Sequence, residues 1–139
     1  MTVRDIARED VVSTGPDTSV SDIATTMRDE NVGSVVVVED GAPVGLVTDR
    51  DIAIEVCEAG ADPESTTARD IMTEDLFTVD VDAGIYEAIE LTSEANVRRV
   101  PVVDDGALVG IVTLDDFIVL LSGELAEIST VVQSESPPY

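Results

Sequence analysis

Apolar and polar positions alternate along the chain in a pattern that occurs twice, and each copy predicts the same five elements. A short apolar strand comes first, followed by an amphipathic helix, a β-branched strand, a return strand and a second helix. In the first copy, Asp40-Gly41 separates two apolar runs, which is a strong signal for a tight hairpin. The second helix is expected to end at Gly60, because glycine commonly follows the last turn of a helix.

The second copy carries the same signals. Its hairpin is predicted at Asp105-Gly106, its last helix is expected to end near Gly123, and the tail 133–139 with its two prolines is expected to be frayed. The short strands are predicted at Val11-Val12 and Leu76-Phe77, and the first helices start near residues 19–21 and near Ile85.

The two copies align without a gap, with Arg4 falling on Arg69, so the chain is one unit written twice. Two copies are too few for a solenoid, and each is therefore expected to complete the other across a pseudo-twofold axis. The predicted fold is α/β (α+β), with a small sheet and two flanking helices in each repeat. The repeats are assigned to residues 1–60 and 68–124, the linker to residues 61–67, and a helix end with the frayed tail to residues 125–139.

The composition predicts a folded protein with an unusually acidic surface. The 139 residues carry 30 acidic and seven basic side chains, a net charge of −23, and every basic residue is arginine. Such a charge excludes non-specific attraction to nucleic acid or to an anionic membrane. The 44% of hydrophobic residues argues against an acidic disordered chain and favours a folded protein from a salt-rich, halophilic cytoplasm. No secretion signal and no apolar run long enough to cross a bilayer are expected.

The chain has no histidine and one cysteine, Cys57, so Ser-His and Cys-His catalysis, zinc sites of His or paired Cys, and an internal disulfide are all excluded. A hydrolase would have only a lone aspartate as its base, and we therefore expect a protein that is not an enzyme. Cys57 lies among apolar residues of a predicted helix and is expected to be a buried core thiol.

Each hairpin ends in a glycine followed by two apolar residues, a threonine and an aspartate three residues later: Gly45 to Asp51 and Gly110 to Asp116. One interpretation is a helix cap, in which the threonine and the aspartate form a capping box. The other is a nucleoside monophosphate site. The helix N-terminus and the threonine would bind phosphate, the aspartate would accept a ribose diol, and the glycine would let a ligand ring approach.

This duplicated motif, with the Val-x-Val-Val-x-Asp-Gly hairpin before it, resembles the cystathionine-β-synthase (CBS) domain, and the resemblance covers about residues 2–121. It implies a regulatory pair of repeats, with two clefts able to hold an adenosyl ligand such as AMP, ADP, ATP, NAD or S-adenosylmethionine. By resemblance, Thr48 and Thr113 contact phosphate, and Asp51 and Asp116 hold ribose hydroxyls. The adenine would lie near Ser13-Thr14, Thr78-Val79, Val32 and Val97.

The positions of the arginines make the two clefts chemically different. Arg98 and Arg99 stand side by side and are either a phosphate clamp or members of exposed ion pairs. Arg50 lies inside the first motif, where the second has Asp115, so the first cleft is expected to bind a phosphate-bearing ligand better. Arg4 and Arg69 are interpreted as structural partners of Asp5 and Asp70.

The resemblance also implies a homodimer that signals to a separate protein in trans. Helix positions at Ile52-Ala53, Val56, Phe117 and Leu120-Leu121 are candidates for the dimer interface or, equally, for ordinary core. The alternative function is an interaction scaffold with empty or degenerate nucleotide sites.

The charge leads to a first prediction. At about 1 M salt the Debye length falls to about 3 Å, so surface carboxylates hardly repel one another, whereas in dilute buffer their repulsion acts in full. We expect the protein to lose structure when salt is removed. Circular dichroism melts in dilute buffer and in molar KCl test this, and identical melts would contradict it.

Overall fold

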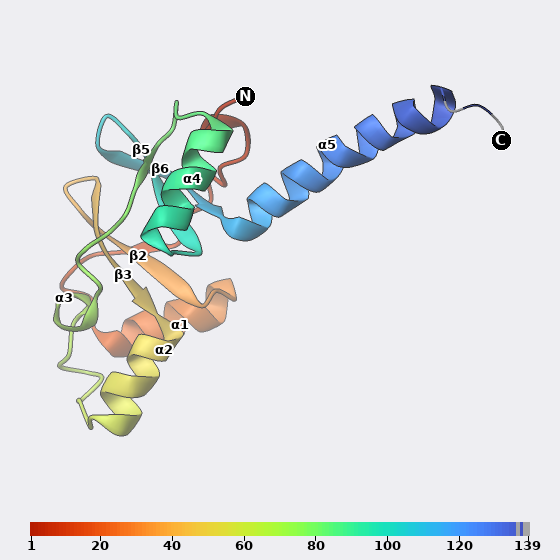
Figure 1. Ribbon diagram of the computed structural model, residues 1–139. Coiled ribbons are helices and arrows are strands. Elements are labelled where there is room, and N and C mark those ends of the chain that lie inside the picture. The colour runs from red at the N-terminus through yellow and green to blue at the C-terminus, as the bar shows by residue number, and fades with distance from the viewer. Residues whose placement is uncertain (136, 138–139) are drawn as a thin grey trace.

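The structure is a computed structural model that describes residues 1–135 and 137. Two three-stranded sheets, ordered β1-β2-β3 and β4-β5-β6, form two lobes, and a long C-terminal helix extends away from them (Figure 1). The strands are β1 (Ser13–Thr14), β2 (Ser34–Glu39), β3 (Ala42–Thr48), β4 (Val79–Asp80), β5 (Arg99–Asp104) and β6 (Ala107–Thr113). The helices are α1 (Val20–Glu30), α2 (Asp49–Ile52), α3 (Ala68–Ile71), α4 (Ile85–Ala95) and α5 (Leu114–Glu135), with a 3-10 helix η1 (Val3–Asp5) and a π-helix η2 (Ala53–Glu58). This confirms the predicted α/β fold of two similar repeats.

The two hairpins form where Asp-Gly predicts them. Asp40 and Gly41 have φ of 52° and 82°, and Asp105 and Gly106 have φ of 50° and 81°. Two successive positive φ angles define the type I′ turn, whose twist matches that of the flanking strands. In each sheet the first short strand pairs in parallel with the central strand, which pairs antiparallel with the return strand.

The helices that connect the parallel strands begin and end as the sequence indicates. Ser19 caps α1, its hydroxyl accepting a hydrogen bond from the backbone N–H of Asp22 at 3.1 Å. Both α1 and α4 end on an asparagine in the left-handed conformation, Asn31 with φ 54° and Asn96 with φ 55°. These asparagines turn the chain into β2 and β5, and the two helix-to-strand corners form there.

Each repeat is completed by the leading segment of the other. The N–H groups of Val3 and Arg4 donate to the carbonyls of Ala83 and Val81 of repeat 2, both at 2.9 Å. At the equivalent positions, the N–H groups of Ala68 and Arg69 donate to Thr18 and Pro16 of repeat 1, also at 2.9 Å. The leading segment of each repeat thus donates the same two hydrogen bonds to the equivalent carbonyls of the other repeat, as a pseudo-twofold axis requires.

The two hydrophobic cores show the same exchange. Val3 is fully buried in the core of repeat 2, beside Val100, Val102 and Phe117. Ala68 is fully buried in the core of repeat 1. Burial of apolar surface is the dominant favourable term in folding, so each lobe depends on the other for part of its stability.

The same exchange explains the glycine of each motif, and it corrects the expectation that a ligand ring needs it. A Cβ on Gly45 would collide with the Sδ of Met72, and one on Gly110 would lie 3.0 Å from the backbone oxygen of Arg8. Met72 and Arg8 both belong to leading segments that cross onto the other repeat. The glycines therefore make room for the leading segment of the other repeat.

Several local expectations were wrong. The short strands are β1 and β4, which begin two and three residues later than the apolar pairs that predicted them. Cys57 is exposed, since η2 is a surface helix in which no residue is buried. For Phe117, core and dimer interface were both open, and its 3% exposure supports the core.

The last helix does not end near Gly123 but continues to Glu135, so the expectation of fraying from residue 133 fails for residues 133–135. Gly60 has φ 77° and ends its helix, whereas Gly123 is not among the described residues with positive φ. The rest of the predicted frayed tail, at residues 136, 138 and 139, lies outside the described residues.

Exchange of the leading segments gives a stability prediction. Truncating Val3→Ala removes two buried methyl groups from the core of repeat 2 and should lower the free energy of unfolding by about 2 kcal/mol. Val119→Ala makes the same chemical change at a side chain that is 72% exposed and should cost far less. Urea unfolding in molar KCl measures both, and equal losses would contradict the role given to Val3.

Candidate nucleotide cleft

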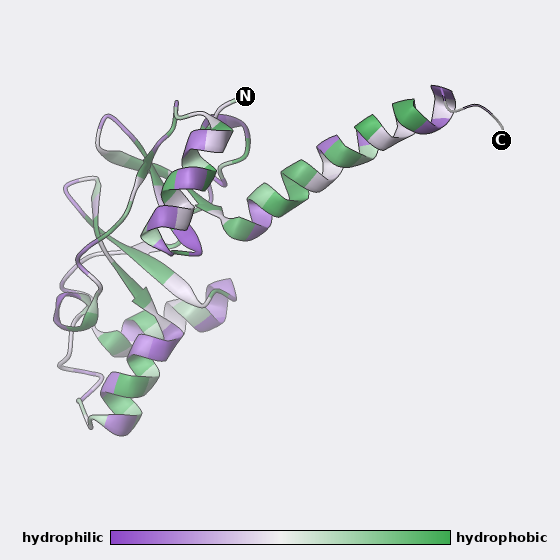
Figure 2. Cartoon of the chain, viewed as in Figure 1, coloured by the Kyte–Doolittle hydropathy of each residue, from purple (hydrophilic) through white to green (hydrophobic). Residues whose placement is uncertain are grey.

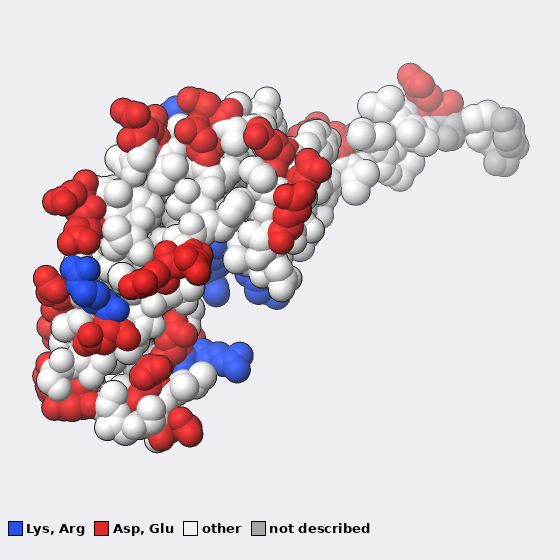
Figure 3. Space-filling view, turned by 60° about the vertical axis from the view of Figure 1, so that its left-hand side comes forward, with Lys and Arg blue, Asp and Glu red and all other residues white. Residues whose placement is uncertain are grey.

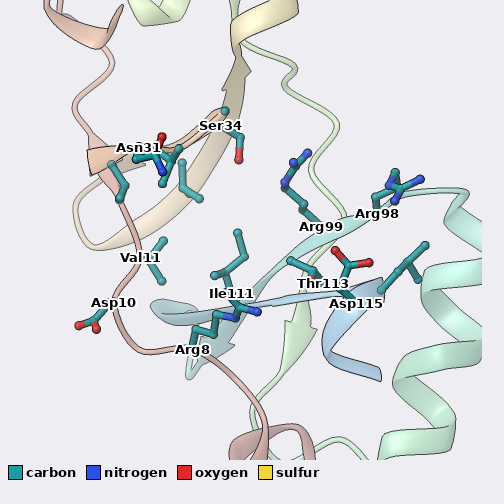
Figure 4. Close-up of a pocket in the computed structure, with 15 residues that line it drawn as sticks. Arg8, Asp10, Val11, Asn31, Ser34, Arg98, Arg99, Ile111, Thr113 and Asp115 are labelled. Atoms are coloured by element: carbon teal, nitrogen blue, oxygen red, sulfur yellow. The ribbon is translucent and has the colours of Figure 1, made fainter. Parts of the chain in front are cut away.

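A cleft of about 360 Å³ lies between the two repeats, at the end of β6. Its walls are the α1–β2 corner of repeat 1, the α4–β5 corner of repeat 2, the segment before β1 and the start of α5 (Figure 4). The volume falls in the range of about 300–1,000 Å³ that is typical of small-molecule sites. The lining residues are Arg8, Asp10, Val11, Val12, Asn31, Val32, Gly33, Ser34, Val36, Arg98, Arg99, Ile111, Thr113, Leu114 and Asp115.

Positive charge gathers at this cleft in a chain that is otherwise acidic. Arg8, Arg98 and Arg99, three of the seven arginines, line it together with two acids, Asp10 and Asp115. Figure 3 shows arginine side chains on both sides of the indentation between the lobes, while acidic groups are scattered over the rest of the visible surface. The lining is thus net positive by one charge against −23 for the chain, which favours an anionic ligand.

The strand register places an arginine beside the motif threonine. Arg99 is the cross-strand partner of Thr113 in the β5–β6 pair. At the equivalent place in repeat 1, the partner of Thr48 is Ser34. In Figure 4, Arg99 extends from β5 into the space between the repeats, with Ser34 across from it. The charge of the corner residue therefore distinguishes the surroundings of the two motifs.

Thr113 and Asp116 form a capping box at the start of α5. The N–H of Thr113 donates to Asp116 Oδ2 at 2.8 Å, and the Thr113 hydroxyl donates to the same oxygen at 2.9 Å. In return, the N–H of Asp116 donates to Thr113 Oγ1 at 3.3 Å. The helix-cap interpretation of the motif is therefore correct, and a ligand would meet a threonine and an aspartate that are already hydrogen-bonded.

The second oxygen of Asp116 is held by Arg8, a residue that the sequence analysis did not select. Arg8 Nη2 and Nε donate to Asp116 Oδ1 at 2.7 and 3.0 Å. The Asp116 side chain is 11% exposed, and the Arg8 side chain is 64% exposed. Burial acts to raise the pKa of Asp116, but the hydrogen bonds from Arg8 and Thr113 outweigh it, and the pKa lies below its ordinary value.

The first motif has the same capping box with different chemistry around it. The N–H of Thr48 donates to Asp51 Oδ2 at 2.9 Å, and the N–H of Asp51 donates to Thr48 Oγ1 at 3.1 Å. Asp49, the next residue, accepts the N–H of Arg50 at 2.8 Å. The Asp49 carboxylate thus already accepts the hydrogen bond of a backbone N–H that a phosphate would need at this helix N-terminus. Leu114, which replaces Asp49 in repeat 2, has no such group.

The structure changes the comparison of the two clefts. Arg50 is exposed and is absent from the lining of the cleft described above, which lies at Thr113 and not at Thr48. The expectation that the motif of repeat 1 makes the better phosphate site therefore finds no support in the geometry. The arginines that line this cleft come from the α4–β5 corner of repeat 2 and from the leading segment of repeat 1.

The remaining predicted site residues fall into two groups. Val32 lines the cleft with Arg98, Arg99 and Thr113, so four of the residues predicted for a ligand site lie at one cleft. Asp116 adjoins the cleft through Arg8. The others do not line it and belong to the short strands, the residue before β4, the α4–β5 corner and the first motif: Ser13, Thr14, Thr78, Val79, Val97, Thr48, Arg50 and Asp51.

Arg4 and Arg69 are structural, as expected, but with other partners. Arg4 forms ion pairs with Asp82 at 3.1 Å and Asp104 at 3.8 Å. Arg69 pairs with Glu39 at 3.3 Å and Asp17 at 3.8 Å. The acids beside them in sequence, Asp5 and Asp70, instead complete capping boxes at η1 and α3. These exposed pairs add contacts between the repeats, since each joins a leading segment to the opposite lobe.

Comparison with known proteins matches both halves of the chain to one family. The sequence profile of the CBS domain matches residues 3–58 and again residues 68–123. An uncharacterized protein of Methanopyrus kandleri is 41% identical over 120 residues, which are 85% of this chain and 61% of that protein. Hypoxic response protein 1 of Mycobacterium tuberculosis is 37% identical over 116 residues, 83% of this chain and 81% of that protein.

Two solved structures extend the likeness to the fold. The crystal structure of Hypoxic Response Protein I, which has two coordinated zinc ions, superposes with a TM-score of 0.77 at 36% identity, over 86% of this chain and 98% of that one. The CBS domain pair of protein MJ0100, in complex with 5′-methylthioadenosine and S-adenosyl-L-methionine, gives 0.76 at 28% identity, over 89% and 98%. Among the residues described here, no group of three His, Cys, Asp or Glu side chains is placed to hold a metal ion.

The Arg8–Asp116 pair predicts how stability depends on pH. Because the pKa of Asp116 is lowered in the folded protein, its ion pair stabilises the fold above the unfolded pKa and this contribution is lost as pH falls through the folded one. Asp116→Asn should therefore lower the melting temperature at neutral pH, and the difference from wild type should shrink as the pH falls below about 5. Asp115→Asn, which leaves the pair intact, is the control. A difference that does not change with pH would contradict the assignment.

Proposed function

The chain belongs to the CBS domain family, and we propose that it is a regulatory module that binds an adenosine nucleotide in the cleft at Thr113. The observation that carries this proposal is the gathering of Arg8, Arg98 and Arg99 at one cleft of a strongly acidic chain. A surface arginine gains little from an exposed ion pair, whereas an arginine fork matches the oxygens of a phosphate.

The phosphate is proposed to lie between Arg99 and the first turn of α5. Arg99 stands beside Thr113 in the sheet, and Arg98 adjoins it at the same corner. The N–H of Leu114 is already used by the carbonyl of Arg98 at 3.0 Å, so the next N–H, that of Asp115, is the donor in this turn that a phosphate would take. The Asp115 carboxylate opposes this anion, which is why the arginines are needed.

The adenosine moiety is assigned to the rest of the cleft. Val11, Val12, Val32 and Val36 give the apolar surface on which an adenine ring packs. The ribose hydroxyls are assigned to Asp116 by family resemblance. Both carboxylate oxygens of Asp116 already accept hydrogen bonds, Oδ2 from Thr113 and Oδ1 from Arg8. The ribose would therefore displace Arg8 from Oδ1, which would free the exposed Arg8 guanidinium to turn toward the phosphates.

The positive lining also favours one class of adenosyl ligand. AMP, ADP, ATP and NAD carry phosphates that the arginines would attract, whereas the sulfonium of S-adenosylmethionine would be repelled. We propose that this sensor works as a homodimer in a salt-rich cytoplasm and passes its signal to a separate protein, with repeats at residues 1–60 and 68–124 joined by residues 61–67.

Single arginine variants test the cleft. Arg98→Gln and Arg99→Gln should each weaken AMP or ATP binding about tenfold or more, because a charge-assisted hydrogen bond contributes about 1.5–3 kcal/mol. Arg28→Gln removes the same charge from a side chain on α1 that pairs with Asp29, and should leave the affinity unchanged. Isothermal titration in molar KCl measures all four proteins. Equal losses in the three variants would point to net charge alone and contradict a clamp.

Aspartate variants and the wild type decide between sensor and scaffold. Asp116→Ala should weaken nucleotide binding and Asp51→Ala should not. If both leave the affinity unchanged, the ribose assignment fails. If millimolar AMP, ATP and NAD do not raise the melting temperature of the wild type, the module is a scaffold with empty clefts, since a ligand that binds only the folded state must stabilise it.

A further inference from the structure

The C-terminal half of α5 is an isolated helix. Every residue from 122 to 135, here called the arm, is exposed, and in Figure 1 the arm runs away from both lobes. Exposure of this extent means that burial contributes little to the stability of the arm, and a helix of this length is marginal in water by itself. Gly123 in its interior lowers its stability further.

One face of α5 carries apolar side chains at alternating spacings of three and four residues. These are Ile118, Leu121, Leu125, Ile128 and Val132. Figure 2 shows the apolar segments recurring along the helix. Ile118, Leu125 and Ile128 are 60%, 67% and 60% exposed. This 3–4 spacing is the seam of a two-stranded coiled coil, which packs against a second stripe of the same kind.

The charges on the helix argue against a lipid partner. By length and hydropathy α5 could cross a membrane, with 6% of its apolar window buried. However, Glu124 and Glu127 would then lie within the span, and carboxylates in the hydrocarbon are costly. The helix has no basic residue with which to bind anionic head groups at a bilayer surface.

We infer that the arm pairs with the arm of a second copy of this chain, stripe against stripe, around a twofold axis. The residues on one flank of the seam, Ser122 and Ser129, are small and uncharged, which lets two helices approach without placing like charges against each other there. The match to the CBS profile ends at residue 123, so all but the first two residues of the arm lie beyond it. This inference does not depend on nucleotide binding.

Two charge-matched double variants test the pairing. Leu125→Asp with Ile128→Asp places carboxylates in the seam and should raise the dimer dissociation constant at least tenfold. Ala126→Asp with Thr130→Asp adds the same charge to the opposite side of the helix and should leave that constant unchanged. Analytical ultracentrifugation of the full chain over a concentration series in molar KCl measures this, and circular dichroism melts of the same samples confirm that the two repeats remain folded.

Three results would overturn the inference. The first is a wild type that stays monomeric at all concentrations. The second is an equal dissociation constant in the two double variants, which would place the dimer interface elsewhere on the module. The third is co-sedimentation of the wild type with phosphatidylcholine or phosphatidylglycerol vesicles that is lost in the seam variant, because the stripe would then face lipid.

Discussion

The exchange of leading segments between the repeats is the constraint on which the rest of the molecule depends. Val3 fills the core of repeat 2 and Ala68 fills that of repeat 1, so neither sheet has a complete core without the other half of the chain. The exchange fixes the two lobes against each other and creates the cleft between them. It also brings Arg8, five residues after Val3, to Asp116 across 108 residues of sequence.

On this symmetric backbone, a few side chains make the two motifs chemically different. The backbone hydrogen bonds, capping boxes and turns repeat between the halves almost bond for bond. Several charged groups around the two motifs do not repeat. Repeat 2 has Arg99 beside its threonine where repeat 1 has Ser34, and Leu114 at the helix start where repeat 1 has Asp49. Backbone geometry is shared because packing demands it, whereas the cleft lining is free to diverge.

The parts of the fold that local chemistry determines could be predicted from the sequence. Asp-Gly turns, the Ser19 cap and the duplicated strands all follow from residues within a few positions of one another. The Arg8–Asp116 pair could not be predicted this way, because it depends on the path of the leading segment. The place of Arg50 outside this cleft could not be predicted either, because membership of a motif does not determine which surface a side chain faces. The continuation of α5 past Gly123 was visible in the 3–4 spacing of its apolar residues, but glycine was taken as a stop signal.

Asp116 has a part in the local structure, in the contact between the repeats and in the proposed ligand site. It caps α5 through Thr113, pairs with the leading segment through Arg8, and is the proposed ribose acceptor. Under the proposed function, a ligand that takes Oδ1 from Arg8 removes one tie between the leading segment and repeat 2, while leaving the cap on Oδ2 intact. By thermodynamic linkage, a change that strengthens the contact between Arg8 and Asp116 must lower the affinity for such a ligand by the same factor. Arg8, which is largely exposed, thus connects the occupancy of the partly buried Asp116 carboxylate to the surface of the molecule, which is what a sensor needs if another protein is to detect its state.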